Sequence, residues 1–450
     1  MTFEQFDVVV LGTGPAGSTV ARKAAAAGHR TAIVEAREFG GTCALRGCNP
    51  KKVYANAGDL IDRVRRADGK LIRGKDVSID WNQLLQFKNE FTNSIPDRSE
   101  RSFQDDGITT VHGAAQFVSK KSLRVGERTL SAERIVVATG ARPATLPFDG
   151  SEHAVQSDEF LALKSLPDKV VFIGGGYISM EFAHVVARAG SRVIIAERED
   201  RVLESFDAKL VEMLQEESRS IGIEFEFCTE VECIEKVDAN CYRVSLSNGE
   251  SIDCGLVVHG AGRVPNVDEL DLKAGNVQSG EKGIAVDRHL RSPSNPHVFA
   301  LGDCADSGVP PLTPSANEEA RIVAKNLFAD EPEAVPDYGV IPHVAFTTPC
   351  IASVGMTVEQ AEEGGRKCEV LFKDTSDWNS VRKLGGGVAG FRIIVDQESD
   401  RLLGAHLLGP AAEETINLFA LAIKFDLTAT DLKSTLFAFP TFASDVRQMV

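Results

Sequence analysis

Two cysteines separated by four residues form the most reactive pattern in this chain. Residues 40–52 read Gly-Gly-Thr-Cys-Ala-Leu-Arg-Gly-Cys-Asn-Pro-Lys-Lys, which places the thiols at Cys43 and Cys48. At the start of a helix, this spacing puts two thiols about one turn apart, near enough to form a disulfide. The helix N-terminus together with Lys51 and Lys52 would stabilise a thiolate. We therefore predict a redox-active cysteine pair.

Other interpretations of this pair are two buried, inert cysteines or half of a metal site, although no His or Cys cluster lies nearby to complete one. Cys228 and Cys233 have the same spacing, but they lie in a strand-like stretch without glycines or lysines, so we expect a structural role. The nine cysteines are an odd number and are scattered, unlike a secreted disulfide framework. This usage predicts a reducing compartment and a cytoplasmic protein.

A nucleotide-binding unit precedes the cysteine pair. The apolar run Phe6–Leu11 predicts a buried parallel strand, followed by a glycine-rich turn, an alanine-rich helix through Ala27, and a second strand from Thr31 to Glu35. Such a turn lets the backbone approach a pyrophosphate at a helix N-terminus, and the acid after the next strand can bind ribose hydroxyls. The candidate ligands of this unit are Gly12, Gly14, Pro15, Ala16, Gly17 and Glu35.

The same order recurs later in the chain. A strand is predicted at Val170–Ile173, a helix at Tyr177–Ala189, and a strand at Arg192–Glu197. The third-glycine position, here Ser179, is 18 residues before Glu197, the spacing that separates the corresponding residues of the first unit. A small residue there still allows close helix packing. The candidate ligands of this second loop are Gly174, Gly176, Tyr177, Ile178, Glu197 and Arg198.

The coenzyme preference is predicted from the end of the second unit. Glu197 is an acid that binds ribose hydroxyls and therefore favours NADH over NADPH. Arg198 and Arg201 could instead hold a 2′-phosphate, or form a solvated turn with Glu199 and Asp200. We expect NADH, with NADPH as the alternative.

Composition and charge restrict the partners. The chain has 450 residues and a formal net charge of −16, which disfavours nucleic acid and anionic membrane surfaces. No apolar stretch approaches the length of a membrane span, and residues 1–7 lack the basic start of a signal peptide. Prolines near 143–147 and 166–167 indicate a domain boundary, and the proline-rich stretch 332–342 precedes a third domain.

These motifs together resemble the pyridine nucleotide-disulfide oxidoreductases of the glutathione reductase, dihydrolipoamide dehydrogenase and mercuric reductase type. The resemblance extends over nearly the whole chain and is carried mainly by the Gly-Gly-Thr-Cys-x4-Cys-x-Pro-x-Lys motif. Further matches follow in the family's order at Ala138–Pro143, Ala300–Asp303, Phe346–Pro349 and Gly404–His406.

The resemblance implies an α/β fold with two Rossmann-like dinucleotide-binding domains, for FAD and NAD(P), and an α+β C-terminal dimerisation domain. We expect the FAD-binding domain at 1–150 and 276–331, the NAD(P)-binding domain at 151–275, and the dimerisation domain at 332–450, which would build a homodimer. The helix near 414–423 is an interface candidate or part of the domain core.

The resemblance also implies roles for single residues. Cys48 would be the thiol nearer the flavin that forms the charge-transfer thiolate, and Cys43 the interchange thiol that attacks the acceptor. The further cofactor ligands implied are Gly41, Thr42, Thr139, Gly140, Gly302 and Asp303 for FAD, and Gly262 for the coenzyme.

A lysine–glutamate pair beside the flavin is implied as well. Glu181 matches its acid, while Lys51 and Lys52 are both candidates for its cation. Tyr177 matches the ring that gates the nicotinamide pocket. On sequence alone, Tyr177 and Glu181 are also simply neighbours on one helix face.

One part of the family pattern is missing. Where these reductases have a C-terminal His-Pro motif that supplies a general acid, this chain has Phe439, and Ser444 replaces the orienting glutamate. Either the acceptor needs no acid, or another group such as Asp445 or a histidine of a substrate protein takes the role. Mercuric reductases also have an aromatic residue there, but their terminal cysteine pair is absent from this chain, which ends Met449-Val450.

The leading functional prediction is an NAD(P)H-dependent FAD oxidoreductase that passes electrons through Cys48 and Cys43 to a small-molecule or protein disulfide or another acceptor. One alternative is an NAD(P)H diaphorase or quinone reductase, in which the flavin alone passes electrons and the cysteines take no part. A metal reductase like mercuric reductase is grouped with this alternative. The other is a noncatalytic redox-sensing subunit.

Overall fold

The computed structural model describes residues 2–74 and 76–450. The chain divides into two compact units, each assembled from three segments. The first contains Met1–Pro50, Phe87–Ala144 and Gly262–Tyr338, and the second contains Lys51–Gln86, Thr145–Ala261 and Gly339–Val450.

The first unit is built on a seven-stranded sheet. Its strand β1 (Thr2–Leu11) lies between β2 (Thr31–Glu35) and β6 (Arg128–Val137), in parallel with both. Outside these, β2 pairs with β3 (Thr109–His112) and β6 with β19 (Val298–Ala300), again in parallel. The antiparallel strands β4 (Ala115–Ser119) and β5 (Ser122–Val125) extend the sheet.

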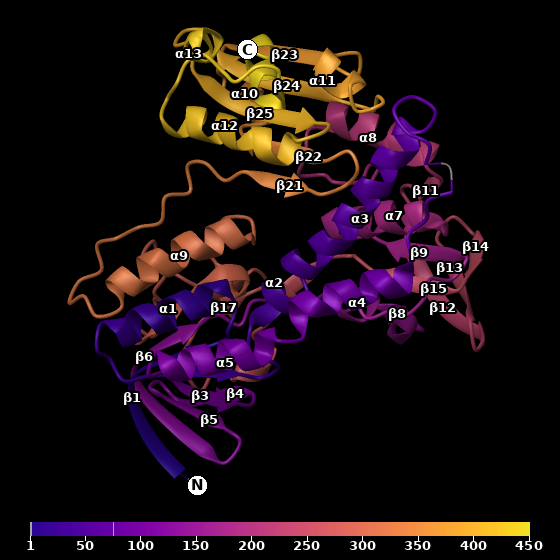
Figure 1. The fold of residues 1–450 in the computed structure, drawn as a ribbon. Helices are drawn as coiled ribbons and strands as arrows, with labels where there is room; N and C mark the ends of the chain where they lie inside the picture. Colours follow the sequence, from indigo (N-terminus) through magenta and orange to yellow (C-terminus); the bar gives the residue numbers. More distant parts are fainter. Residues whose placement is uncertain (1, 75) are drawn as a thin grey trace. The chain divides into compact units, whose positions relative to one another are not determined.

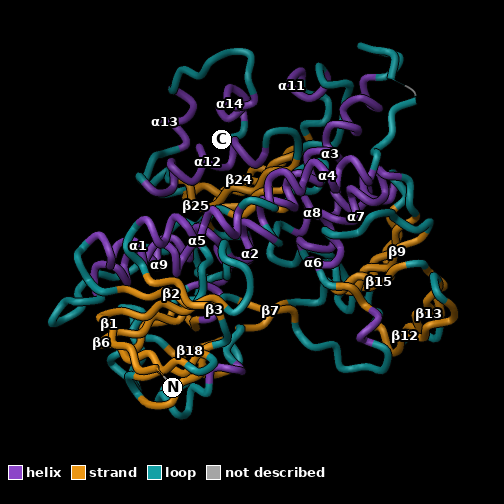
Figure 2. The backbone as a smooth tube through the Cα atoms, turned by 60° about the horizontal axis from the view of Figure 1, so that its bottom comes forward, coloured by secondary structure: helices purple, strands orange, loops and turns teal. Residues whose placement is uncertain are grey.

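Helices cover this sheet because its strands are apolar on both faces. The helices α1 (Pro15–Ala26) and α9 (Thr313–Asn326) lie side by side (Figures 1 and 2). Val20 of α1 and Val323 of α9 are fully buried in one shared core. The unit also contains α2 (Gly41–Leu45), α5 (Ile95–Asp105), β7 (Ala141–Pro143), β16 (Arg263–Pro265), β17 (Ser279–Gly280), β18 (Gly283–Ala285) and β20 (Ala305–Asp306).

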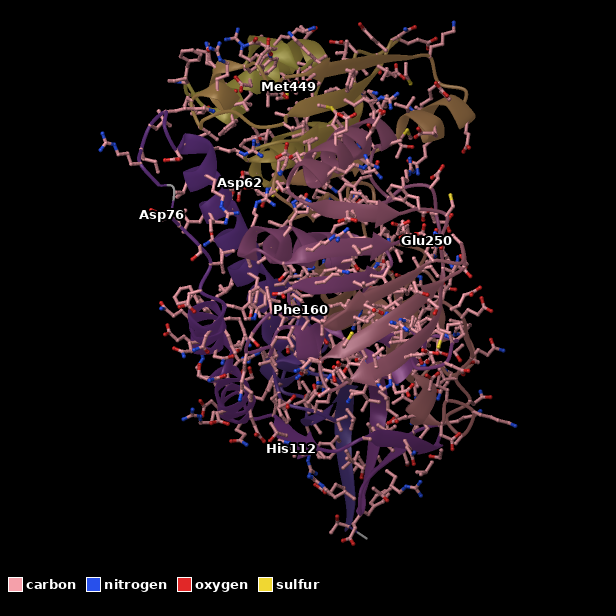
Figure 3. The ribbon with its side chains drawn as sticks, turned by 90° about the vertical axis from the view of Figure 1, so that its right-hand side faces the viewer. Asp62, Asp76, His112, Phe160, Glu250 and Met449 are labelled. Atoms are coloured by element: carbon pink, nitrogen blue, oxygen red, sulfur yellow. The ribbon has the colours of Figure 1, made fainter. Side chains whose placement is uncertain are left out.

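The second unit contains a parallel five-stranded sheet in the order β11-β10-β9-β15-β8. Its strands are β8 (Ala154–Val155), β9 (Lys169–Ile173), β10 (Arg192–Ala196), β11 (Ile223–Glu226) and β15 (Leu256–His259). The helices α6 (Ser157–Phe160), α7 (Tyr177–Ala189) and α8 (Ala208–Ser220) belong to it, as does the antiparallel sheet β12 (Val231–Asp238), β13 (Cys241–Leu246) and β14 (Ser251–Cys254). Phe160, labelled in Figure 3, is fully buried in the core.

Two long helices connect the units along the chain. The helix α3 (Cys48–Ala67) begins in the first unit and continues in the second, and α4 (Trp81–Thr92) runs from the second unit into the first. Within the second unit, Tyr54 of α3 packs edge-to-face on Trp81 of α4 and joins the core that contains Phe182 of α7. Asp62, labelled in Figure 3, projects from α3.

The C-terminal segment of the second unit forms a five-stranded antiparallel sheet in the order β21-β22-β25-β24-β23. The strands are β21 (His343–Ala345), β22 (Ile351–Gly355), β23 (Cys368–Asp374), β24 (Gly390–Asp396) and β25 (Leu402–Leu408). The helix α12 (Ala412–Lys424) buries Ile416, Phe419 and Ala422 against this sheet. The remaining helices are α10 (Val358–Glu363), α11 (Asn379–Arg382), α13 (Ala429–Ser434) and α14 (Phe442–Asp445).

Both predicted strand–helix–strand units are present. The helix α7 has the predicted bounds, since Gly176 precedes it and Gly190 ends it in a left-handed conformation that favours glycine. The helix α12 buries one face in its own sheet, as the intradomain alternative predicted, while Leu421 on another face is exposed. Among the described residues, none of the helices combines the length and the apolarity needed to cross a membrane.

Candidate active site

The two thiols of the predicted pair lie in the first unit, but on two helices rather than on one. Cys43 lies in α2, and Cys48 is the first residue of α3. The expectation of one continuous helix was wrong, because Arg46 leaves the helical region with φ −139° and ψ 6° and thereby ends α2. The pair is present as two thiols rather than as a disulfide, and Cys48 is the more exposed of the two.

The side chain of a third residue contacts both thiols. The hydroxyl of Thr313, the first residue of α9, lies 3.7 Å from the sulfur of Cys43 and 3.7 Å from that of Cys48. The hydrogen bond to Cys48 and then burial raise the pKa of Cys43 above its ordinary value. Thr313 was not predicted from the sequence, because the Thr-Pro pair at a helix start indicates only where α9 begins and not what it contacts.

The two phosphate loops have the same internal arrangement. In the first unit, Glu35 accepts a hydrogen bond from the backbone N–H of Thr13 at 3.1 Å. In the second unit, Glu197 accepts one from the backbone N–H of Gly175. The partners are 22 residues apart in both cases, so the sequence repeat is also a structural repeat. Each acid holds its own loop in place.

The glycines of the first loop are of two kinds. A Cβ at Gly12 would lie 2.3 Å from the carbonyl oxygen of Ala138, and one at Gly17 would lie 2.1 Å from that of Gly12. A side chain at either position would collide with the backbone, so the packing of the protein itself requires these two glycines. Around Gly14 and Gly140, in contrast, no atom of the described chain lies within 4 Å of such a Cβ. This open space fits the close approach of a pyrophosphate.

Buried polar groups in the same unit also fit FAD. Burial raises the pKa of Asp303, a carboxyl group that hydrogen bonds from sugar-like hydroxyls would satisfy. The loop of Asp303 is held by the buried Glu319, which accepts a hydrogen bond from the N–H of Gly302 at 2.5 Å. The hydroxyl oxygen of Ser315 is buried without a hydrogen-bond partner among the described residues. The other predicted FAD ligands, Pro15, Ala16, Gly41, Thr42 and Thr139, lie in this unit too.

In the second loop, serine occupies the position of the third glycine, and a glycine on the facing strand makes room for it. Ser179 is fully buried in α7, and a Cβ built on Gly260 would lie 1.9 Å from its hydroxyl oxygen. The close helix–strand approach is therefore preserved by a glycine on the strand side. The predicted ligands Gly174, Gly176, Tyr177, Ile178, Glu197 and Arg198 are all in this unit, whereas Gly262 belongs to the first.

The side chain of Arg198 is 71% exposed and pairs with Glu199 at 3.0 Å. Arg201 donates a hydrogen bond to the carbonyl of Glu204 at 3.1 Å. Both arginines thus interact with neighbouring residues of their own turn.

The second unit brings both candidate lysines to one carboxylate. The Nζ atoms of Lys51 and Lys52 lie 3.1 Å and 2.7 Å from the same Oε2 of Glu181. The other oxygen of Glu181 accepts a hydrogen bond from the backbone N–H of Phe346 at 3.0 Å. Glu181 and Lys51 are buried, whereas the side chain of Lys52 is 32% exposed. Lys52 and Phe346 also line a cavity of about 320 Å³.

The C-terminal stretch has no proton donor at the position of the family's histidine. The side chain of Phe439 is 86% exposed. Asp445 ends α14, and burial raises the pKa of its carboxyl above the ordinary value. Asp445 is therefore an acid with enhanced capacity to carry a proton in this segment.

Comparison with known proteins identifies the class. The family described as pyridine nucleotide-disulphide oxidoreductase matches residues 6–320, and its dimerisation domain matches residues 341–450. The chain belongs to the pyridine nucleotide-disulphide oxidoreductase family, as its motifs predicted. The predicted fold class is confirmed, and the matched dimerisation domain supports a homodimer.

The chain is similar to several characterised members of this family. It is 31% identical over 442 residues to a glutathione reductase of Burkholderia cepacia, covering 98% of this chain and 97% of the relative. It is 32% identical over 462 residues to dihydrolipoyl dehydrogenase 2 of Haloarcula marismortui, covering 98% and 95%. A solved structure, the Cu(II) complex of the HOCl-induced flavoprotein disulfide reductase RclA from Escherichia coli, matches with a TM-score of 0.89 and 27% identity over 99% of both chains.

Proposed function

We propose that this protein is an NAD(P)H-dependent FAD enzyme that passes electrons to the Cys43–Cys48 pair and from there to an external acceptor. The observation that carries this proposal is the joint contact of Thr313 with both sulfurs. FAD, when bound, would supply the two-electron exchange between the coenzyme and the thiol pair. The open space at Gly14 and the half-buried Asp303, whose pKa is raised by burial, support its binding to the first unit.

Within the pair, the two sulfurs have different roles. Cys43, whose pKa is raised, would hold its proton until an acceptor approaches. Cys48, which the family resemblance makes the thiol nearer the flavin, would carry the negative charge. Attack of the Cys43 sulfur on an acceptor disulfide releases one thiol and forms a mixed disulfide. Attack of Cys48 on Cys43 then releases the second thiol and leaves Cys43 and Cys48 joined. One acceptor disulfide is reduced to two thiols for each dithiol oxidised.

Anaerobic titration with NADH tests this proposal. We expect a long-wavelength absorbance band after addition of two electrons, and its loss in Cys48→Ser, because the band requires the thiolate of Cys48. Cys43→Ser should keep the band but lose disulfide turnover. Simple bleaching of the flavin in the wild-type protein would exclude the thiols from the reaction.

Reduction of a soft metal ion is a second candidate, favoured by two observations. Phe439 stands where the reductases of the family have a general acid, and an electron acceptor that is a metal ion needs no proton. The structurally similar RclA was solved as a Cu(II) complex. Oxidation of the dithiol to the disulfide would reduce two Cu(II) to two Cu(I) and release two protons. In residues 2–74 and 76–450, no group of three or more His, Cys, Asp or Glu side chains is arranged to hold a metal ion. In this proposal the ion is a substrate that meets the thiols of Cys43 and Cys48.

An acceptor panel separates these candidates and the diaphorase alternative. Turnover is measured with oxidised glutathione, lipoamide, cystine, Hg(II), Cu(II) and quinones for the wild-type protein and for Cys43→Ala. If the wild-type protein reduces a disulfide or a metal ion and Cys43→Ala does not, electrons pass through the Cys43–Cys48 pair. Equal quinone turnover by both proteins, with no activity on the other acceptors, supports a diaphorase. NADH against NADPH is compared in the same assay, and Glu197 leads us to expect NADH. Light scattering tests the homodimer.

A further inference from the structure

Two consecutive glutamates of α9 contact different parts of the first unit. Glu319 is 1% exposed, and each of its carboxylate oxygens has its own partner. One oxygen accepts a hydrogen bond from the backbone N–H of Gly302 at 2.5 Å, and the other accepts one from the hydroxyl of Tyr338 at 2.8 Å. Glu318 instead accepts a hydrogen bond from the backbone N–H of Asp337 at 3.1 Å. Both glutamates therefore bind the segment 337–338, but of the two only Glu319 also binds Gly302.

The hydroxyl of Tyr338 fixes the orientation of the Glu319 carboxylate. Tyr338 is the last residue of the first unit and lies in the proline-rich stretch that leads to the C-terminal segment. The side chain of Ser307 forms a hydrogen bond with the same carboxylate. Burial raises the pKa of Glu319, and the hydrogen bonds from Ser307, Gly302 and Tyr338 oppose this rise. The carboxylate is held at both oxygens, so it cannot turn away from Gly302 without losing a hydrogen bond in a buried place.

The contact with Gly302 determines how the next residue, Asp303, is held. Gly302 begins the short 3-10 turn that ends at Cys304, with Asp303 between them. The thiol of Cys304 is fully buried and donates a hydrogen bond to the carbonyl of Val137 at 3.4 Å. Asp303 is therefore anchored through both of its neighbours. Loss of the Glu319 contact would release the turn at one end.

We propose that Glu319 and Tyr338 are positioning residues for FAD: Tyr338 orients the Glu319 carboxylate, and Glu319 holds the turn so that Asp303 faces the sugar-like chain of the flavin. This inference rests on the proposed function for the identity of the ligand. The stretch that leads to the C-terminal segment thereby contributes to flavin binding.

Hydrogen–deuterium exchange of the whole chain without FAD tests the contact in the absence of any flavin. Glu319→Ala should accelerate exchange in a peptide that covers residues 300–306 by about tenfold, because the N–H of Gly302 loses a charged acceptor. Tyr338→Phe, a milder change, should accelerate it less. Glu318→Ala is the matched control and should leave this peptide unchanged. Equal exchange in the Glu318 and Glu319 variants would overturn the proposal.

The conservative variant Glu319→Gln separates geometry from charge. The amide oxygen of glutamine can accept the hydrogen bond from Gly302, and its amide nitrogen can donate one to the hydroxyl oxygen of Tyr338. We therefore expect slow exchange at residues 300–306 to be retained in Glu319→Gln. Exchange as fast as in Glu319→Ala would contradict a positioning role.

Titration with FAD and with ADP tests the consequence for binding. ADP contains the adenosine and diphosphate of FAD but lacks the ribityl chain and the flavin ring. Glu319→Ala should weaken FAD binding by about tenfold, as for loss of a hydrogen bond to a charged group, and should leave ADP binding unchanged. Glu319→Gln and Glu318→Ala should bind FAD like the wild-type protein.

Two outcomes of this titration contradict the inference. One is unchanged FAD binding in Glu319→Ala, and the other is equal weakening of FAD and ADP, which would indicate a general loss of structure. If exchange changes as expected but the wild-type protein binds no FAD, the proposed function is rejected and the role of Glu319 in flavin binding is rejected with it.

Discussion

The hydroxyl of Thr313 donates a hydrogen bond to the sulfur of Cys43 at 3.7 Å, although the two residues are 270 positions apart in the chain. This contact lowers the pKa of Cys43, against the larger effects of Cys48 and burial that raise it. Thr313 therefore adjusts the reactivity of the thiol that would meet the acceptor.

Substitution of Thr313 by valine should make Cys43 less reactive. Valine has nearly the same shape but cannot donate a hydrogen bond to a thiolate, a contact worth about 1 kcal/mol. We expect alkylation of the reduced protein by iodoacetamide near neutral pH to slow by about three- to tenfold. The measurement uses Cys48→Ser as background so that only one thiol of the pair reacts. Thr313→Ser, which keeps the hydroxyl, should react like the parent, and equal rates for the valine and serine variants would contradict this role.

The two kinds of glycine in the first phosphate loop should respond differently to alanine. Gly14 has φ −65° and open space around a Cβ, so Gly14→Ala should leave the stability of the FAD-free protein within about 0.5 kcal/mol. The same methyl group should lower FAD content, because it occupies the space that a pyrophosphate would need. Gly12→Ala is the contrasting variant, since Gly12 has φ +100° and a Cβ would collide with Ala138. FAD content and thermal unfolding are measured for both, and full FAD content in Gly14→Ala would contradict the assignment.

The packing of Ser179 on Gly260 predicts a compensating pair of substitutions. Gly260→Ala should destabilise the protein by about 1–3 kcal/mol, because the new methyl group collides with the Ser179 hydroxyl. Ser179→Gly alone should cost about 0.5–1 kcal/mol as a glycine within a helix. The double variant should be more stable than Gly260→Ala in urea unfolding. If the double variant loses as much stability as the two single variants together, the contact between Ser179 and Gly260 does not limit packing.

Features that depend on residues close together in the sequence could be predicted, whereas features that depend on tertiary contacts could not. Local patterns were sufficient for α7, where apolar spacing and flanking glycines specify both ends. They failed between Cys43 and Cys48, because four intervening residues are compatible with a continuous helix as well as with the break that occurs at Arg46. Thr313 escaped prediction because only tertiary structure brings α9 to the thiols. The choice between Lys51 and Lys52 stayed open for a physical reason, since both ammonium groups contact Glu181.

A buried histidine predicts a pH dependence of stability. His184 is 1% exposed, and burial, followed by the charge of Arg188, lowers its pKa well below the ordinary value. The unfolded chain binds this proton near pH 6.5 and the folded chain does not, so stability is present above pH 6.5 and is lost as the pH falls below it, at roughly 1.4 kcal/mol per pH unit. Urea unfolding of the wild-type protein and of His184→Gln, between pH 8 and pH 5, measures this effect. A steeper loss in the wild type is expected, and parallel curves would contradict it.

The pairing of β19 with β6 has a consequence for biosynthesis. The strand β6 ends at Val137, but its partner β19 begins only at Val298, so the ribosome must complete about two thirds of the polypeptide before the first sheet can close. During that interval, residues 135–137 of β6 lack the strand that later pairs with them, and such an open edge can pair with other chains. Nascent chains arrested before residue 298 should therefore be protease-sensitive in their first strands, although the first phosphate loop and both reactive thiols have already been synthesised in the segments between those strands.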